Sequence, residues 1–198
     1  MTTSTEPEHR ALRRDASENR RRLIEAARLV FAEHGMEAGV EEVAHRAGVG
    51  VGTLYRRFPT KDALIAELVR TLLDEVLESA RQASTVPGGD GLEHFLFDVG
   101  AAHAANRGCL ARLWNDETTT TLRQEIRTRM ATLLDDARRH GRIRDDATIA
   151  DVDLTFWSLR GVLEASGHDL PDAWRRQVAI SVAGLRPSAE ALSQPALA

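Results

Sequence analysis

Apolar residues recur at helical spacing along almost the whole chain. Between positions 12 and 33 they repeat every three or four residues, so that they share one face of a helix. These apolar positions are Leu23, Ala26, Ala27, Val30 and Phe31. Convincing runs of alternating apolar and polar residues, which half-buried strands require, are missing from the sequence. The pattern therefore predicts an all-α fold.

Breaks in this pattern divide the chain into about nine helices. Gly35 ends the first helix, because glycine is common just past the last helical turn, and Thr60 is a natural N-cap. The proline- and glycine-rich stretch 84–91 is the clearest loop. The predicted helices are Leu12–Glu33, Val40–Ala47, Val51–Phe58, Lys61–Ser84, Leu92–Asn106, Cys109–Trp114, Thr121–His140, Ile149–Ser166 and Pro171–Leu185.

Composition places the chain in a broad class. Its 198 residues are 42% hydrophobic and 28% charged, which is ordinary for a globular protein. A single cysteine, Cys109, cannot form an internal disulfide, and no apolar run approaches the roughly 20 residues that cross a bilayer. The N-terminal segment contains acidic side chains and no apolar core, unlike a secretory signal. We therefore expect a cytoplasmic protein without a membrane partner.

The most informative segment is 40–64, VEEVAHRAGVGVGTLYRRFPTKDAL. A helix-turn-helix needs a small residue where its two helices meet, here Ala44, and a residue that tolerates a left-handed turn four positions later, here Gly48. The apolar residues on the two inner faces are Val40, Val43, Ala47, Val49 and Leu54. The segment is internally consistent as a helix-turn-helix, although an ordinary helical hairpin would satisfy the same spacing.

Three groups of residues sharpen this interpretation: Gly48-Val49, Gly52-Thr53-Leu54-Tyr55 and Phe58-Pro59-Thr60-Lys61-Asp62-Ala63-Leu64. Together they resemble the DNA-binding domain of TetR-family transcriptional regulators, whose typical form is AGVSxGTLYxHFxSKEEL. The resemblance covers about residues 18–68. It implies a homodimer in which an N-terminal three-helix domain binds DNA and a helical C-terminal domain binds a small molecule. The closing PDAWRRQVAISVAGLRP also resembles the last helix of the SbtR-like subgroup.

The resemblance and the helix pattern together divide the chain into four regions. These are a flexible arm at 1–16, a helix-turn-helix DNA-binding domain at 17–62, a helical ligand-binding and dimerisation domain at 63–187 and a disordered tail at 188–198. The function implied is a DNA-binding transcriptional regulator, a repressor that binds a palindromic operator as a dimer and is released by a ligand. The implied partners are operator DNA, a second copy of the chain and a small hydrophobic or aromatic effector.

Carried over by position, the second short helix becomes the recognition helix in the major groove. Thr53 and the first backbone amides then face base edges or phosphates, and Tyr55 places its hydroxyl on a phosphate. Arg56 and Arg57 read bases or clamp the DNA backbone, and Lys61 holds a phosphate at the start of the next helix. The predicted DNA-binding residues are Val51, Gly52, Thr53, Tyr55, Arg56, Arg57, Lys61, Arg20 and Arg21.

Some residues depart from the family pattern, and others have two alternative roles. A hydroxyl residue is common at the N-caps of both short helices, whereas this chain has Gly39 and Gly50 there, which weakens both caps. Arg57 stands where histidine or tyrosine is common, so its base preference should differ. Arg20–Arg22 either belong to an arm that contacts the minor groove or phosphates of DNA, or lie in a solvated, disordered tail. The net charge of −4 does not decide between them, because the distribution of charge matters more than its sum.

Polar residues among large apolar ones in the C-terminal half suit a small-molecule pocket. We expect this pocket between the helices that begin at Lys61, Leu92, Thr121 and Ile149. An ordinary apolar core would account for the same pattern. The predicted ligand-binding residues are Phe95, Val99, His103, Asn106, Trp114, Met130, Leu134, Phe156, Trp157 and Arg160.

The last two helices are the predicted dimer interface, because two apolar helices from each subunit can form a four-helix bundle. A core within one subunit could also absorb their apolar stripes, so this assignment depends on the resemblance. The predicted interface residues are Thr155, Leu159, Val162, Leu163, Trp174, Val178, Ser181, Val182 and Leu185.

The sequence gives little support for metal binding or for enzymatic catalysis. His94, His103 and Cys109 do not follow any metal-ligand spacing, and no Ser-His-Asp arrangement stands out. We therefore expect no enzymatic activity, no metal and no cofactor. The alternative function is a helical small-molecule-binding protein or small enzyme in which the helix-turn-helix is only scaffold. A DNA-binding regulator that responds to a partner protein, without an effector, is a third reading.

Overall fold

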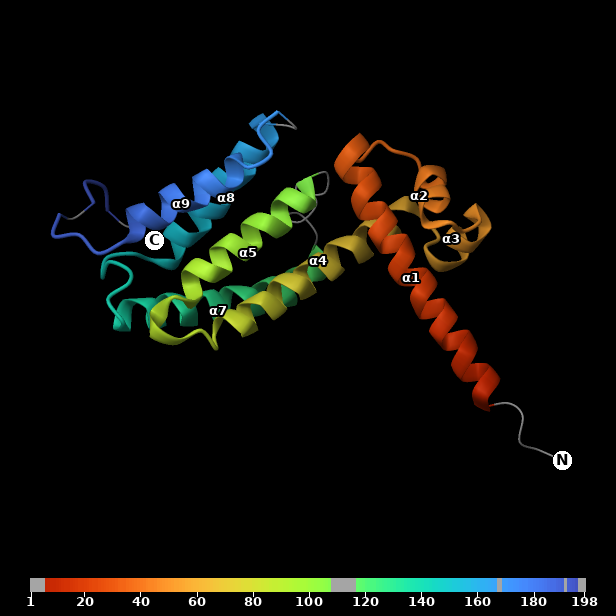
Figure 1. Ribbon diagram of the computed structural model, residues 1–198, viewed down its shortest axis with the longest axis horizontal. Helices are drawn as coiled ribbons and strands as arrows, with labels where there is room; N and C mark the ends of the chain where they lie inside the picture. The colour runs from red at the N-terminus through yellow and green to blue at the C-terminus, as the bar shows by residue number, and fades with distance from the viewer. Residues whose placement is uncertain (1–5, 108–116, 167–168, 191, 196–198) are drawn as a thin grey trace.

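A computed structural model of the chain describes residues 6–107, 117–166, 169–190 and 192–195, and the regular structure in these ranges is helical (Figure 1). The all-α fold predicted from the apolar spacing is confirmed. The predicted helix at 109–114 lies outside the described residues. The α-helices of the described ranges are α1 (Glu6–His34), α2 (Val40–Ala47), α3 (Val51–Arg57), α4 (Lys61–Ala83), α5 (Gly91–Ala105), α7 (Thr120–Arg139), α8 (Ile149–Ser166) and α9 (Ala173–Leu185).

The N-terminus differs from the expectation of a flexible arm over 1–16. Helix α1 already begins at Glu6, so it extends through most of the predicted arm. The segment 6–16 is rich in Glu, Arg, Ala and Leu and contains no glycine, and these residues have high helix propensity. Pro7 falls in the first turn, where its missing N–H removes no helical hydrogen bond.

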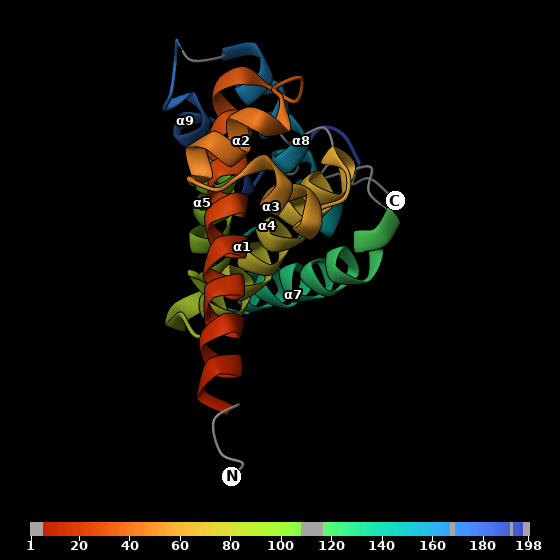
Figure 2. The same ribbon diagram turned by 90° about the vertical axis from the view of Figure 1, so that its right-hand side faces the viewer.

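The first three helices form a small N-terminal domain. Helix α1 packs against α2 and α4, and α2 packs against α3. Figures 1 and 2 show α1 as a long helix that crosses α4, with α2 and α3 beside it. Phe31 of α1 and Leu54 of α3 are fully buried in the core of this domain. Their burial fixes α3 relative to α1.

Helix α4 leaves the N-terminal domain and continues into the C-terminal half. It begins where the sequence predicts, because the Oγ1 atom of Thr60 accepts a hydrogen bond from the backbone N–H of Ala63 at 3.0 Å. Further along, α4 packs against α5 and α7. One continuous helix of 23 residues thus connects the two halves.

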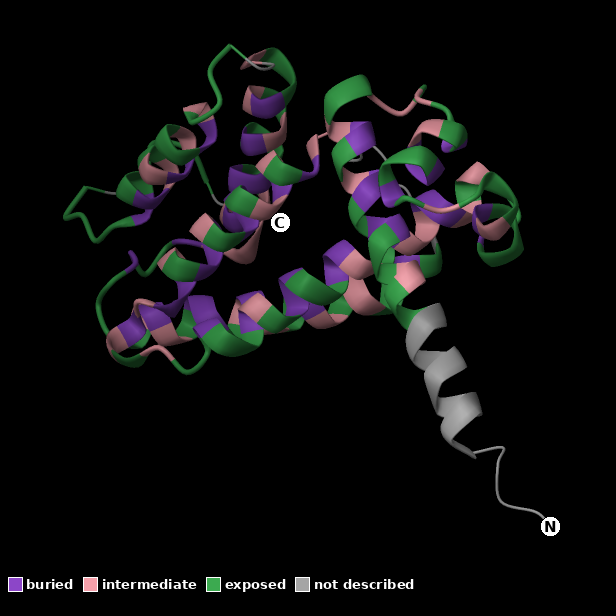
Figure 3. Ribbon diagram, turned by 45° about the vertical axis from the view of Figure 1, so that its right-hand side comes forward, coloured by how far each residue is buried: buried purple, intermediate pink, exposed green. Residues whose placement is uncertain are grey.

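The C-terminal half is completed by α8 and α9. Helix α9 packs against α5 and α8, and Figure 3 shows buried residues on the sides of the helices that face one another. Gly100 permits the contact between α5 and α9, because a Cβ atom there would lie 2.6 Å from the ring of Trp174. In the described ranges, no helix is both long enough and apolar enough to cross a membrane.

Candidate nucleic-acid interface and ligand cavity

The turn between α2 and α3 has the geometry that the sequence predicts. Gly48 adopts a left-handed conformation with φ of +65°. The N–H of Val49 donates to the carbonyl of Ala44 at 3.0 Å and the N–H of Gly48 to that of His45 at 3.0 Å, which are the two bonds of a Schellman motif. Ala44 is fully buried. The predicted structural roles of Ala44 and Gly48 are therefore confirmed.

Arg22 of α1 braces the same turn. Its guanidinium donates to the backbone carbonyls of Ala47 and Gly48, where α2 ends. A cation suits this end of a helix because its last carbonyls lack partners within the helix. The sequence alone does not predict this role of Arg22, since only the fold brings its side chain to a carbonyl 25 positions later.

Helix α3 buries one side and exposes the rest, and the N-caps of α2 and α3 lack side-chain hydrogen bonds, as the sequence predicts. Leu54 faces the core with no exposed surface, whereas Tyr55 is 44% exposed. Neither Gly39 nor Gly50 provides a side-chain cap for α2 or α3. Figure 3 shows α3 at the outer edge of the N-terminal domain. The predicted DNA-binding residues that α3 exposes are Val51, Gly52, Tyr55, Arg56 and Arg57.

Thr53 and Lys61 flank this exposed face of α3. Thr53 is half-buried, and its Oγ1 atom accepts a hydrogen bond from Nη2 of Arg56 at 3.0 Å, so that Thr53 orients Arg56. Lys61 is the first residue of α4, and its Nζ atom lies 5.9 Å from the ring centroid of Phe31. A cation at a helix start adds to the backbone N–H groups that bind anions there.

The two N-terminal arginines of the predicted site have protein partners. Arg20 forms an ion pair with Glu67 of α4, and Arg57 and Arg70 also act on it electrostatically. Arg21 pairs with Glu18 at 2.7 Å within α1, and this hydrogen bond lowers the pKa of the Glu18 carboxyl. Arg20 therefore connects α1 to α4, while DNA contact by either arginine stays a prediction.

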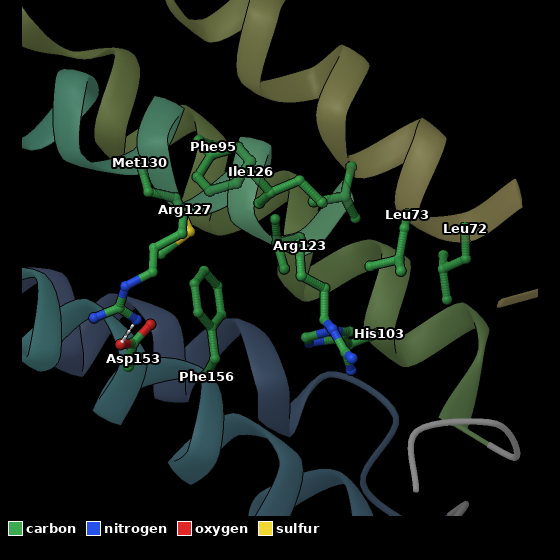
Figure 4. Close-up of a pocket in the computed structure, with 12 residues that line it drawn as sticks. Leu72, Leu73, Phe95, His103, Arg123, Ile126, Arg127, Met130, Asp153 and Phe156 are labelled. Carbon is green, nitrogen blue, oxygen red and sulfur yellow. Dashed lines mark hydrogen bonds and ion pairs between the residues drawn. The ribbon is translucent and has the colours of Figure 1, made fainter. Parts of the chain in front are cut away.

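A cavity of about 170 Å³ lies among α4, α5, α7 and α8, the four helices that the sequence predicts around the pocket (Figure 4). The predicted ligand-binding residues in its lining are Phe95, Val99, His103, Met130 and Phe156. The lining residues that the sequence analysis missed are Leu72, Leu73, Val76, Arg123, Ile126, Arg127 and Asp153. Helical spacing could have indicated Asp153, which precedes Phe156 by three positions on α8.

The rings at the centre of this cavity pack edge to face. Phe95 and Phe156 have ring centroids 6.4 Å apart at 88°, and His103 and Phe156 have centroids 6.1 Å apart at 85°. Burial lowers the pKa of His103 to about 4, because the charged imidazolium loses its hydration. His103 is therefore neutral at pH 7. Arg127 forms an ion pair with Asp153 across α7 and α8.

Other predicted ligand-binding residues do not line the cavity. Trp157 is 56% exposed, and Arg160 pairs with Glu164 at 2.7 Å. Adjacent residues on a helix point about 100° apart, so Trp157 leaves the side of α8 on which Phe156 lies. Asn106 and Leu134 are also buried outside the lining, and Trp114 lies outside the described residues.

Most residues of the predicted dimer interface are buried within one subunit, and their role in dimerisation stays a prediction. Most of its side chains have little surface left for a partner, because α9 packs them against α5 and α8 within the subunit. The seven buried residues are Thr155, Leu159, Leu163, Trp174, Val178, Val182 and Leu185. Val162 and Ser181 are partly exposed. The apolar stripes of α8 and α9 that the sequence reveals therefore belong mainly to the core of one subunit.

A different side of these two helices carries exposed apolar residues. Leu154 and Trp157 of α8 are 41% and 56% exposed, and Ile180 of α9 is 53% exposed. Val162 and Ile180 also line one shallow surface groove. We call Leu154, Trp157, Val162 and Ile180 the outer α8–α9 face. Of this set, only Val162 is among the interface residues predicted from the sequence.

Comparison with known proteins accounts for both halves of the chain. Residues 23–68 match the family described as "Bacterial regulatory proteins, tetR family". Residues 87–187 match the family described as "Transcriptional regulator SbtR-like, C-terminal domain". The chain belongs to the TetR family. It is thus a helix-turn-helix transcriptional regulator, and the resemblance found in the sequence, including its SbtR-like C-terminal half, is confirmed.

Individual relatives agree with this assignment. A TetR transcriptional regulator from Streptomyces coelicolor is 30% identical with a TM-score of 0.66, over 86% of this chain and 99% of that structure. A TetR regulator from Mycobacterium vanbaalenii is 29% identical with a TM-score of 0.67, over 88% and 99%. An HTH-type transcriptional regulator from Staphylococcus aureus is 38% identical over 72 residues, but the match spans only 36% of this chain and 39% of the relative.

Proposed function

We propose that this TetR-family regulator is a repressor that binds a palindromic operator as a homodimer and is released by a small-molecule effector. The exposed face of α3 carries this proposal. A buried Leu54 anchors the helix, and Tyr55, Arg56 and Arg57 stand free of the core on its outer side. Such a helix suits the major groove, where arginine can address guanine and tyrosine a phosphate. The regulator would act in the cytoplasm, together with the bacterial chromosome.

A second subunit is required because one short recognition helix makes few base contacts. Two-fold symmetry doubles the contacts and spaces the half-sites by a helical turn of DNA or a multiple of it. We assign the dimer contact to the outer α8–α9 face in place of the buried stripes. Trp157 and Ile180 are more than half exposed there, and large exposed apolar side chains favour a protein interface.

Release by an effector would act through α4. Leu72, Leu73 and Val76 of this helix line the cavity. On the same helix, Glu67 pairs with Arg20 of α1 and Glu75 pairs with Arg28 of α1, the latter at 2.6 Å. A ligand that displaces α4 would therefore move the N-terminal domain and change the separation of the two recognition helices. Couplings of this kind change affinity about 5- to 150-fold.

Operator binding can be tested by fluorescence anisotropy with the DNA upstream of the protein's own gene. We expect specific binding that weakens steeply with salt. The variant Arg57→Gln should lower affinity about tenfold or more, whereas Arg139→Gln, which removes an exposed arginine far along the chain on α7, should not. If the protein ignores this DNA at low salt yet binds cavity ligands, the alternative of a helical small-molecule-binding protein gains support.

The dimer contact can be tested by sedimentation equilibrium. Trp157→Glu places a charge in the proposed contact and should give monomers, whereas Trp174→Phe changes a buried tryptophan of α9 and should leave the dimer intact. Intact dimers of the Trp157→Glu protein would exclude the outer α8–α9 face.

LfrR from Mycobacterium smegmatis, a neighbour with a TM-score of 0.57 and 18% identity, is known in complex with proflavine. That complex supports a small molecule as the effector type.

A further inference from the structure

Among the described residues that line the cavity, positively charged side chains outnumber negatively charged ones. Its charged groups are the guanidinium groups of Arg123 and Arg127 and, among the described residues, the single carboxylate of Asp153. Arg127 donates to this carboxylate, so Asp153 already has a cationic partner inside the lining. His103 adds no charge at neutral pH, because burial holds its pKa at about 4. The lining therefore favours an anionic ligand over a cationic one.

The charged groups are also separated in space. Figure 4 draws Arg123 and His103 on one side of Phe156 and the Arg127–Asp153 pair on the other side. The space between these polar ends is bounded by apolar side chains, including Phe95 and Phe156. A ligand that fits this arrangement has an apolar body and one acidic group at the Arg123 end.

The size of the cavity limits the apolar body. Its volume is about 170 Å³, and an apolar cavity of about 150 Å³ accepts benzene. One aromatic ring therefore fits without rearrangement, and a second needs more space than a single ring does. Aromatic rings also match the edge-to-face packing of Phe95 and Phe156.

We propose that the effector is a small aromatic carboxylic acid of one or two rings, whose ring contacts Phe95 and Phe156 and whose carboxylate binds Arg123. This inference rests on the proposed role of the cavity as the effector site. A guanidinium has five N–H donors, so Arg123 can bind a ligand carboxylate alongside a protein partner. The pairing of carboxylate with arginine is charge-assisted and planar, which gives selectivity over neutral groups of the same shape.

Isothermal titration calorimetry with matched probes tests this proposal on the full-length protein. The probes are benzoate and 1-naphthoate, their neutral amides benzamide and 1-naphthamide, and the cationic benzylamine. We expect at least one acid to bind about tenfold or more tightly than its amide, and benzylamine to bind weakest.

Three variants separate the possible outcomes. Arg123→Gln should abolish the preference for acid over amide while leaving amide binding in place, which also shows that the variant is folded. Arg139→Gln removes an exposed arginine of the same helix outside the lining and should keep the preference. Val99→Phe fills the cavity and should weaken binding of acid and amide alike.

The results distinguish failure of the ligand class from failure of the cavity as a site. If acids and amides bind equally, or Arg123→Gln and Arg139→Gln behave alike, the aromatic-acid proposal is wrong while the cavity remains a binding site. If no probe binds, or Val99→Phe leaves binding unchanged, the cavity is not the site and the effector part of the proposed function fails with it. Operator binding, measured separately, is unaffected by either result.

Discussion

The two halves of this TetR-family regulator have differently packed cores. In the N-terminal domain Ala27, Phe31 and Leu54 have no exposed surface, and the helices meet closely at Ala44. In the C-terminal half, the core around Phe95 and Phe156 encloses a cavity of about 170 Å³. The N-terminal core, which we call the filled core, holds α3, the proposed recognition helix. The hollow core leaves room for a ligand and for movement of the helices that surround it.

Helix α4 is the element that both cores share. Its first turns pair with α1, and its later turns line the cavity. The contrast bears on the proposed regulation, because a ligand in the cavity would contact a helix that also pairs with α1.

Truncation in the filled core should be costly. Phe31→Ala should lower the free energy of unfolding by about 3–5 kcal/mol, since it removes a fully buried ring from a core that cannot collapse around the gap. Urea unfolding followed by circular dichroism measures the loss. Leu29→Ala, at a site that is 40% exposed on the same helix, is the control and should cost much less. Equal losses would contradict the tight packing of this domain.

Acid should weaken the hollow core through His103. The folded protein has a His103 pKa of about 4 against 6.5 for the free side chain, so the unfolded chain takes up the proton first. The free energy of unfolding should therefore fall as the pH drops from 6.5 to 4, by roughly 3 kcal/mol from this group, and the contribution should level off below pH 4.

The His103→Gln variant isolates this contribution from that of the carboxylates. Its free energy of unfolding should fall less steeply than that of the wild type between pH 6.5 and pH 4, because glutamine does not titrate. Urea unfolding of both proteins at closely spaced pH values measures the difference. Parallel curves for the two proteins would mean that His103 is not held neutral by burial.

Added volume should distinguish the two cores directly. Ala27→Leu forces extra methylene groups into the filled core and should cost about 1–3 kcal/mol. Val99→Leu adds one methylene beside the cavity and should cost less than about 0.5 kcal/mol, because the space to receive it exists. Melting temperatures of the two variants give the comparison. A Val99→Leu protein as unstable as Ala27→Leu would indicate that the cavity closes in solution.

The smallest effects concern the helix caps. Thr60→Ala should lower the free energy of unfolding by about 1 kcal/mol, since it removes the hydrogen bond to the N–H of Ala63. Gly50→Ser should raise it by a few tenths, because a Cβ atom at Gly50 meets nothing within 4 Å and its backbone is extended. Chemical denaturation measures both. A loss of stability in Gly50→Ser would show that the N-cap glycine of α3 is needed for the turn.

The N-terminal domain was largely predictable because its signals are local. The left-handed turn at Gly48, the small residue at Ala44 and the cap at Thr60 each depend on residues a few positions apart. The hydrogen bonds of Arg22 in this domain could not be predicted from the sequence. The carbonyl groups that accept them, those of Ala47 and Gly48, come close to Arg22 only when α2 packs against α1. The predicted arm at 1–16 was mostly helical in the structure, since high local propensity continues α1 to Glu6.

In the C-terminal half, the sequence determined that helices exist and where each apolar stripe lies, because the period of 3.6 residues is a property of one segment. It did not determine what each stripe packs against. Only the tertiary structure placed Trp174 and Val178 inside the subunit, left Trp157 and Ile180 outside it, and brought Arg123 and Asp153 to the cavity. Burial depends on the neighbouring helices, and residues far apart in the chain supply them.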